Sequence, residues 1–210
     1  MAAAAIPEAF ATAYDALFLQ AGLQAGETLL VHAVGSGVGL AALALAKRSG
    51  ARVVGTSRTA DKLRRAALLG LDVGVLTTAP GWSDEVQRHV PRGIDVVLDL
   101  VGAATLAGDL EVVATRGRIV MVGLVSGAKA ELQLGKLLAK RAHLIGTVLR
   151  SRPLDEKIAL ARSFEHAVVP GFESGALKPQ VDTVMSAREV GRAHELLESN
   201  TTFGKIVLTW

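Results

Sequence analysis

The stretch Thr28–Ala46 contains no Asp, Glu, Lys or Arg and carries three closely spaced glycines, Gly35, Gly37 and Gly39. An apolar run of strand length, TLLVHA, precedes the glycines, and an apolar segment of helical length follows them. A strand, a tight turn and a buried helix explain this stretch better than a membrane span, because glycines and a histidine interrupt its apolar residues. The sequence therefore predicts a βα unit whose turn can bind a phosphate at the start of the helix.

Apolar segments of strand length alternate with helical segments along most of the chain. After an amphipathic helix at about 7–21, strands are expected at 28–33, 51–57, 72–76, 93–102, 117–124 and 143–150, with helices between all but the last two. Strands that are apolar on both faces are typical of a parallel sheet covered by helices on both sides. We therefore expect an α/β doubly wound parallel sheet, a Rossmann fold, at 26–152, preceded by the N-terminal helix (1–25) and followed by helices and a final strand at 153–210.

Two helix starts carry capping signals. Thr59 is expected to cap the helix that ends near Gly70, because a threonine at this position can accept a backbone N–H. Ser186 with Glu189 three residues later is a capping box that opens a helix in the last part of the chain.

The end of the second predicted strand distinguishes between classes of nucleotide. A site for NAD has an acid about 20 residues beyond the turn, and a methyltransferase has an acid there and another before the glycines. Here Ser57 and Arg58 end the strand, Lys62 follows one helical turn later, and no acid precedes the glycines. A hydroxyl, a guanidinium and an ammonium would bind the 2′-phosphate of NADPH. The pattern favours NADPH over NADH and S-adenosylmethionine; the alternative is a solvated helix start.

Composition limits the remaining functions. The formal charge of +3 is spread along the 210 residues, which favours small anionic ligands over nucleic acid. The sequence has no cysteine, which excludes disulfides, a cysteine nucleophile and cysteine-bound zinc, and which fits a reducing cytoplasm. The five histidines show no metal-binding spacing, and MAAAAIPEAF lacks the features of an export signal. We expect a cytoplasmic protein without metal, nucleic-acid or membrane partners.

The motifs together resemble the medium-chain dehydrogenase/reductase family, within it the zinc-free quinone oxidoreductase branch and its p53-inducible type. The similar segments are IPEAFATAYDAL (6–17), AGETLLVHAVGSGVG (25–39), GIDVVLDLVG (93–102), GRIVMVGL (117–124), LRSR (149–152) and GKIVL (204–208). They follow the family order over nearly the whole chain. Ser36 stands where the branch has the central glycine of its A-x-x-G-x-x-G turn. The resemblance implies hydride transfer from NADPH to a small quinone or enone.

The resemblance also implies which residues bind the cofactor. Ala33, Ser36 and Gly39 would form the cofactor-binding turn, with Ser36, Gly37 and Val38 in contact with the pyrophosphate. The 2′-phosphate would lie on Ser57, Arg58 and Lys62, and the nicotinamide beside Gly123, Leu124, Leu149, Arg150 and Ser151. Gly204 and Lys205 would close over the cofactor. Lys205 could equally be an ordinary charge at a strand edge. Ser151 and Arg152 are the polar pair expected near the nicotinamide, but no catalytic residue is assigned. His32 and Tyr14 are expected in the core, and Asp99 is expected to cap the turn that follows its strand.

Family members begin with a lobe that this chain lacks, so the last helix and strand are expected to be remnants of a catalytic lobe. The functional alternatives are a non-catalytic NADPH-binding module and an enoyl reductase domain of a polyketide-type synthase. The resemblance further implies a homodimer in which strand 143–150 pairs with its copy across a two-fold axis. The run of Leu144, Ile145, Val148 and Leu149 would otherwise be a hazardous free edge.

Overall fold

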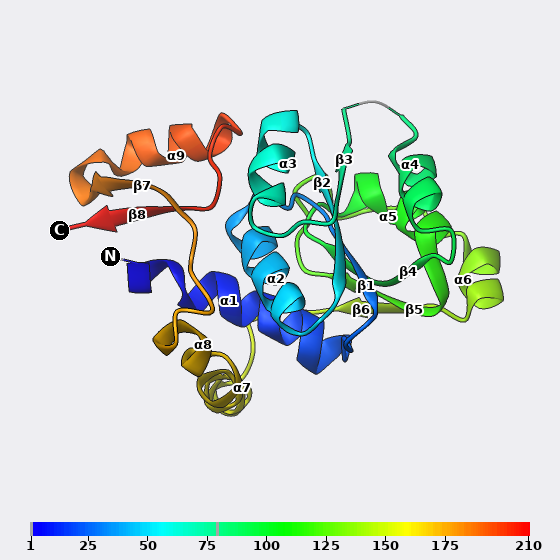
Figure 1. Ribbon diagram of the computed structural model, residues 1–210, viewed down its shortest axis with the longest axis horizontal. Coiled ribbons are helices and arrows are strands. Elements are labelled where there is room, and N and C mark those ends of the chain that lie inside the picture. The colour runs from blue at the N-terminus through cyan, green and yellow to red at the C-terminus, as the bar shows by residue number, and fades with distance from the viewer. Residues whose placement is uncertain (1, 79) are drawn as a thin grey trace.

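A six-stranded parallel sheet with helices on both faces forms the larger part of the molecule (Figure 1). The structure is a computed structural model that describes residues 2–78 and 80–210. The strands are β1 (Thr28–Val31), β2 (Arg52–Ser57), β3 (Val73–Leu76), β4 (Ile94–Asp99), β5 (Val113–Met121) and β6 (His143–Gly146). Their order, β3-β2-β1-β4-β5-β6, is that of the doubly wound dinucleotide-binding fold. The predicted fold class is therefore confirmed.

Helices bury both faces of this sheet. One face packs against α1 (Pro7–Tyr14), η2 (Asp15–Gln20), α2 (Gly37–Arg48) and α3 (Ala60–Ala67), and the other against α4 (Trp82–His89), α5 (Ala103–Val112) and α6 (Leu134–Lys140). Along β1, Leu29 and Val31 enter the first core and Leu30 enters the second, and all three are 0 % exposed. Successive residues of a strand point to opposite faces of the sheet. A sheet with helices packed on both faces therefore requires strands that are apolar at every position.

A second, smaller sheet lies on the side of the molecule opposite α6 (Figure 1). It consists of the parallel pair β7 (Val181–Ser186) and β8 (Lys205–Thr209), joined by η3 (Ala187–Glu189) and α9 (Val190–Glu198). Before it, α7 (Leu154–Ala167) and α8 (Val169–Glu173) pack beside α1, and η1 (Ala2–Ala5) lies beside β8. No helix within the described residues is long and apolar enough to cross a membrane.

Several predicted boundaries are wrong. The helix expected at about 7–21 is divided into α1 and the wider turns of η2. The strand expected at 117–124 already begins at Val113, because Val113 pairs with Ile94 of β4. The strand expected at 143–150 ends at Gly146, where the chain turns away from the sheet edge. The elements η1, α6, α8 and β7 were not predicted.

The two capping predictions have different outcomes. The capping box of Ser186 and Glu189 is confirmed, since both of its reciprocal hydrogen bonds are present. The prediction for Thr59 is wrong. Thr59 stands at the N-cap of α3, but its hydroxyl accepts no backbone N–H, and among the described residues this buried oxygen has no hydrogen-bond partner.

A buried carboxylate in η2 explains why the chain turns after β6. Asp15 is 0 % exposed and accepts hydrogen bonds from Gln20 Nε2 (3.0 Å), Thr147 Oγ1 (2.7 Å) and both terminal nitrogens of Arg152 (3.0 and 2.7 Å). The planar guanidinium matches the carboxylate with two parallel bonds. Arg152 therefore binds the N-terminal part of the chain and holds the segment that follows β6 against it.

Candidate dinucleotide site

The predicted cofactor residues gather at the carboxyl edge of the large sheet. All six strands are parallel, so the segments that follow β1, β2, β4, β5 and β6 leave the sheet at the same edge. The connections from β1 and β4 run to opposite faces, which creates a crevice between these two strands. A dinucleotide in this crevice would have one nucleotide over β1 and β2 and the other over β4, β5 and β6.

The glycine turn leads directly from β1 into α2. Ser36 is the N-cap of α2, and its Oγ accepts a hydrogen bond from Gly39 N at 3.0 Å. Gly37 and Val38 follow at the first helical positions, where N–H groups have no acceptor within the helix. A Cβ on Gly39 would lie 2.6 Å from Ala33 O, so only glycine fits there. The turn therefore offers free N–H groups and a helix dipole to an anion.

Two lysines lie over this turn from different elements. The aliphatic stem of Lys62, from α3, packs on Gly35, where a Cβ would lie 2.8 Å from Lys62 Cδ. The stem of Lys205, at the start of β8, packs in the same way on Gly37. The structure thus places Lys205 at the turn, and both ammonium groups can contribute positive charge to it.

The segment Asn200–Lys205, here called the C-terminal strap, joins the last strand to the glycine turn. Gly204 N donates to Gly35 O at 3.0 Å, and Ser36 and Gly204 form an isolated parallel bridge. Gly204 has a φ of +101°, and a Cβ there would collide with Gln180 O, so this contact requires glycine. That Gly204 and Lys205 close over a bound cofactor stays a prediction; the strap lies on the turn that would receive the pyrophosphate.

A cluster of bases without an acid at the strand end occupies the adenosine side of the crevice. Lys62 is 9 % exposed, and its Nζ donates to Asn200 Oδ1 at 3.0 Å. The Arg65 guanidinium stacks on the ring of Phe203 at 4.2 Å. Burial, followed by the charges of Arg58 and Arg65, lowers the pKa of Lys62, although Asp182 opposes this shift. A phosphate would offset the mutual repulsion of these cations.

The remaining residues on the adenosine side include two that the sequence predicted and three that it did not. Arg58 is exposed, whereas Ser57 is buried and its Oγ accepts a hydrogen bond from Thr59 N at 3.2 Å. Asn200 and Phe203 of the strap were not predicted. They are far from α3 along the chain, so no motif or periodicity in the sequence links them to Lys62 or Arg65. Arg65 was detectable, since it lies three residues after Lys62 on the same helix.

The predicted nicotinamide side is formed by backbone close packing after β4 and β5. A Cβ on Gly102 would lie 3.1 Å from Leu124 Cα and 3.2 Å from Gly123 O, and a Cβ on Gly123 would lie 2.5 Å from Leu100 O. Asp99 holds this region: its Oδ1 accepts from Val101 N at 2.7 Å and from Gly102 N at 3.0 Å. The predicted capping role of Asp99 agrees with these bonds.

The residues after β6 do not lie as a single polar group. Leu149 packs against the first core, while Arg150 and Ser151 are exposed. Arg152 is bound to Asp15, whereas Ser151 is exposed, so the expectation that these two residues form a polar pair near the nicotinamide stays a prediction. The other core predictions agree with the structure: Tyr14 packs inside and bonds Ser163 at 2.8 Å, and His32 is buried with partners on both ring nitrogens.

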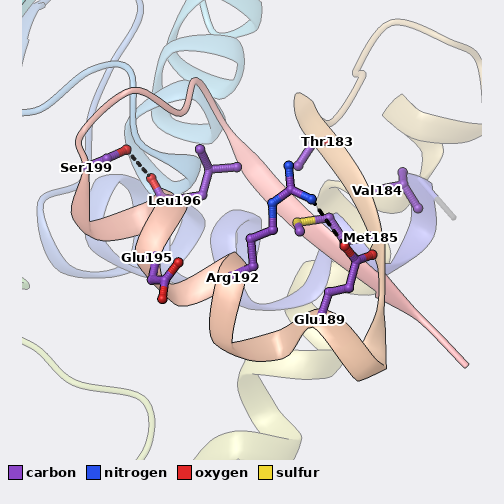
Figure 2. Close-up of a pocket in the computed structure, with 8 residues that line it drawn as sticks. All are labelled: Thr183, Val184, Met185, Glu189, Arg192, Glu195, Leu196 and Ser199. Carbon is purple, nitrogen blue, oxygen red and sulfur yellow. Dashed lines mark hydrogen bonds and ion pairs between the residues drawn. The ribbon is translucent and has the colours of Figure 1, made fainter.

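One cavity lies away from the sheet edge, between β7 and α9 (Figure 2). Its volume is about 500 Å³, and it is lined by Thr183, Val184, Met185, Glu189, Arg192, Glu195, Leu196 and Ser199. Figure 2 shows Arg192 and Glu189 in an ion pair of 3.3 Å beside Met185. Residues 2–78 and 80–210 contain no group of three or more His, Asp or Glu side chains that could hold a metal ion.

Comparisons with known proteins agree with this geometry. Residues 37–168 match the family described as zinc-binding dehydrogenases. The human quinone oxidoreductase is 30 % identical over 98 % of this chain and 61 % of its own length. A spectinabilin polyketide synthase system protein of Streptomyces orinoci is 32 % identical over 99 % of this chain and 9 % of its own. The crystal structure of an NAD-dependent alcohol dehydrogenase superposes with a TM-score of 0.87 at 36 % identity, over 99 % of this chain and 58 % of that one.

Proposed function

The chain belongs to the zinc-binding dehydrogenase family, and from this membership we propose that it is the NADPH-binding part of a zinc-independent quinone or enone oxidoreductase. The observation that carries the proposal is the base cluster beside the glycine turn: Arg58 and Lys62 follow β2, and β2 itself ends without an acid. The chain spans 61 % of the length of the human relative, so the activity of a whole enzyme is part of the proposal.

The described residues fit this cofactor. Ala33–Gly39 would hold the pyrophosphate, because the turn accepts no Cβ at Gly39 and presents N–H groups at Gly37 and Val38. Ser57, Arg58 and Lys62 would hold the 2′-phosphate, and Lys205 would close over the turn. The bound cofactor supplies the hydride; the protein binds and orients it.

On the other half of the crevice, the backbone after β5 and β6 would flank the nicotinamide. The residues concerned are Gly123, Leu124, Leu149, Arg150 and Ser151. We assign no catalytic residue among them.

Zinc does not fit the described residues. The sequence contains no cysteine, and no cluster of His, Asp and Glu within 2–78 and 80–210 could hold a metal ion. We derive no step through zinc and propose hydride transfer without it, in spite of the name of the family.

The cofactor preference is tested by titrating NADPH and NADH into the protein. We expect tighter binding of NADPH, and we expect Arg58→Ala to weaken it about 10-fold or more while leaving NADH unchanged. The reason is that a charge-assisted bond to the 2′-phosphate contributes about 1.5–3 kcal/mol, and NADH lacks this group. Tryptophan fluorescence or calorimetry measures both affinities.

Arg64→Ala is the matched control for this test. Arg64 lies on the same helix, but its side chain is 71 % exposed and pairs with Asp61, so both affinities should remain unchanged. Equal affinities for NADPH and NADH in the unmodified protein would contradict the cofactor assignment. Equal affinities would favour the use of NAD, as in the similar alcohol dehydrogenase structure, which is described as NAD-dependent.

The reaction is tested by following NADPH absorbance with small quinones and with an α,β-unsaturated thioester. Oxidation by quinones supports the proposal, and oxidation by the thioester alone favours an enoyl reductase domain, the alternative supported by the match to a polyketide synthase protein. Binding of NADPH without oxidation by either acceptor would favour a non-catalytic module.

We further propose that the protein is a dimer through β6. This strand is at the edge of the sheet; Leu144 within it is 40 % exposed, and Val148, two residues beyond its end, is 54 % exposed. Ile145 and Leu149 instead pack against the core, so the apolar edge is shorter than predicted. Light scattering should give twice the mass of one chain, and Leu144→Lys should reduce the measured mass to that of a single chain. A single-chain mass for the unmodified protein at high concentration would contradict the proposal.

The limits of the two parts of the chain and the cellular location of the protein are also proposals. We propose that 26–152 binds the nucleotide and that 153–210 packs against a catalytic lobe, since β7 and β8 form a parallel sheet of only two strands. Limited proteolysis would test the division. A cytoplasmic location stays a prediction from cysteine usage.

A further inference from the structure

A histidine and an aspartate form a fully buried pair beneath the glycine turn. His32 Nε2 lies 2.7 Å from Asp109 Oδ1, and both side chains are 0 % exposed. His32 directly follows β1 and immediately precedes the turn, while Asp109 comes from α5. The Trp82 ring of α4 packs edge-on against His32, with ring centres 4.9 Å apart. Neither member of the pair has a role in the cofactor site described above.

The hydrogen-bond partners of His32 accommodate two protonation states. With a neutral imidazole, Nε2–H donates to Asp109 and Nδ1 accepts from the hydroxyl of Thr56, which lies 2.9 Å away. With an added proton on Nδ1, the second bond reverses, and Nδ1–H donates to the Thr56 oxygen. A hydroxyl can serve in both directions, so neither state leaves a ring nitrogen of His32 without a partner.

The charges around the pair favour the added proton. Asp109 Oδ2 is buried and has no hydrogen-bond partner among the described residues. Burial raises the pKa of Asp109 to about 6, and the charge of Asp99, at the end of β4, adds to this rise while His32 opposes it. Burial acts to lower the pKa of His32, but the charge and hydrogen bond of Asp109 and the charge of Asp99 raise it above its ordinary value.

Thr56 connects the pair with the backbone of the turn. Its hydroxyl contacts His32, and its carbonyl oxygen accepts a hydrogen bond from Val34 N at 2.9 Å. Val34 O in turn would lie 2.7 Å from a Cβ on Gly39, so this backbone packs tightly against the start of α2. The charge of the pair is therefore close in the structure to the segment that would receive the pyrophosphate.

We propose that His32 and Asp109 together hold one exchangeable proton beneath the glycine turn, and that a dinucleotide binds more tightly when this proton is present. The second part rests on the proposed function, because it requires a nucleotide at the turn. A pyrophosphate brings negative charge to this end of the sheet and stabilises the protonated pair. By reciprocity, nucleotide binding raises the pH at which the proton is lost, and the affinity falls as the pH rises.

Trp82 reports the state of the pair without a nucleotide. The sequence has two tryptophans, and the other, Trp210, is fully exposed, so Trp210→Phe leaves Trp82 as the only one. A protonated imidazole in contact with an indole quenches its fluorescence. We expect Trp82 emission to titrate with pH, with a midpoint above that of an ordinary histidine, because the pKa of His32 is raised. Asp109→Asn should remove it, and His89→Asn, at an exposed histidine, should leave it unchanged.

Saturating NADP⁺ tests the linkage in the same Trp210→Phe protein. We expect the midpoint of the Trp82 titration to rise, and the affinity for NADP⁺ to be about 5-fold or more higher at low than at high pH. The 2′-phosphate of NADP⁺ itself titrates near about pH 6 and makes the same contribution to the pH dependence of binding in Asp109→Asn. The difference in pH dependence between the Trp210→Phe protein and the same protein with Asp109→Asn therefore measures the contribution of the His32–Asp109 pair.

Each result decides one claim. A folded protein whose Trp82 emission does not titrate overturns the inference, as does a midpoint that NADP⁺ leaves unchanged although it binds. If NADP⁺ does not bind at all, the proposed function fails together with the linkage, while the titration of Trp82 still shows whether the proton exists. Should Asp109→Asn not fold, the shift caused by NADP⁺ in the unmodified pair remains decisive.

Discussion

Replacing Gly39 by alanine is expected to weaken dinucleotide binding about 100-fold. A Cβ at this position would lie 2.6 Å from Ala33 O and 2.7 Å from Val34 O, both of which are backbone atoms that cannot rotate away. The turn must open, and the N–H groups of Gly37 and Val38 then lose their alignment. The loss of two charge-assisted bonds of about 1.5 kcal/mol each, the lower end of their usual range, accounts for this factor. Calorimetric titration with NADPH measures it.

Gly135→Ala is the matched control for this substitution. Gly135 is also a helical glycine, in α6, but a Cβ there would meet no atom within 4 Å. The change should leave the affinity unaltered and raise the free energy of unfolding by about 0.5–1 kcal/mol, because alanine favours the helix. Unchanged nucleotide affinity in Gly39→Ala would show that the turn is not the pyrophosphate site.

Replacing Arg152 by methionine is expected to lower the free energy of unfolding by about 3–5 kcal/mol, the usual effect of removing one partner of a buried ion pair. Asp15 would keep its charge in a site that is 0 % exposed and would lose two of its hydrogen bonds. For a chain of this length, the melting temperature should fall by about 10 °C. Urea unfolding and calorimetry measure these two quantities.

The double variant Asp15→Asn with Arg152→Met tests the cause. With the carboxylate gone, most of the lost stability should return, and the double-mutant cycle gives the coupling between the two residues. At temperatures where Arg152→Met is folded, its affinity for NADPH should be that of the unmodified protein. A loss of affinity in the folded variant would instead support a place for Arg152 at the nicotinamide.

The parts of the site that the sequence predicted are those built from local neighbours. The strand, the turn and the helix around Gly37 are consecutive, and Ser36 caps the helix that directly follows it. The residues that were missed reach the site from far along the chain. Asn200 bonds Lys62 across 138 positions, and no periodicity or motif records such a contact.

Errors in the fold have similarly physical causes. The strand expected at 143–150 ends at Gly146, and a buried carboxylate in another element, Asp15, binds Arg152 in the segment that follows. The strand β7 mixes polar and apolar residues that are all partly or fully exposed, so it carries no pattern of burial. Its position is determined by pairing with β8, which is a long-range interaction.

The bridge between Ser36 and Gly204 joins a segment near the start of the chain to one near its end. Contacts between such distant segments close a long loop, whose entropy cost opposes their early formation, so we expect this bridge to form late in folding. The glycine turn and α2 can assemble before the strap covers them. The ability to retain a nucleotide would then be acquired in the last folding step, and a bound nucleotide would slow the first step of unfolding.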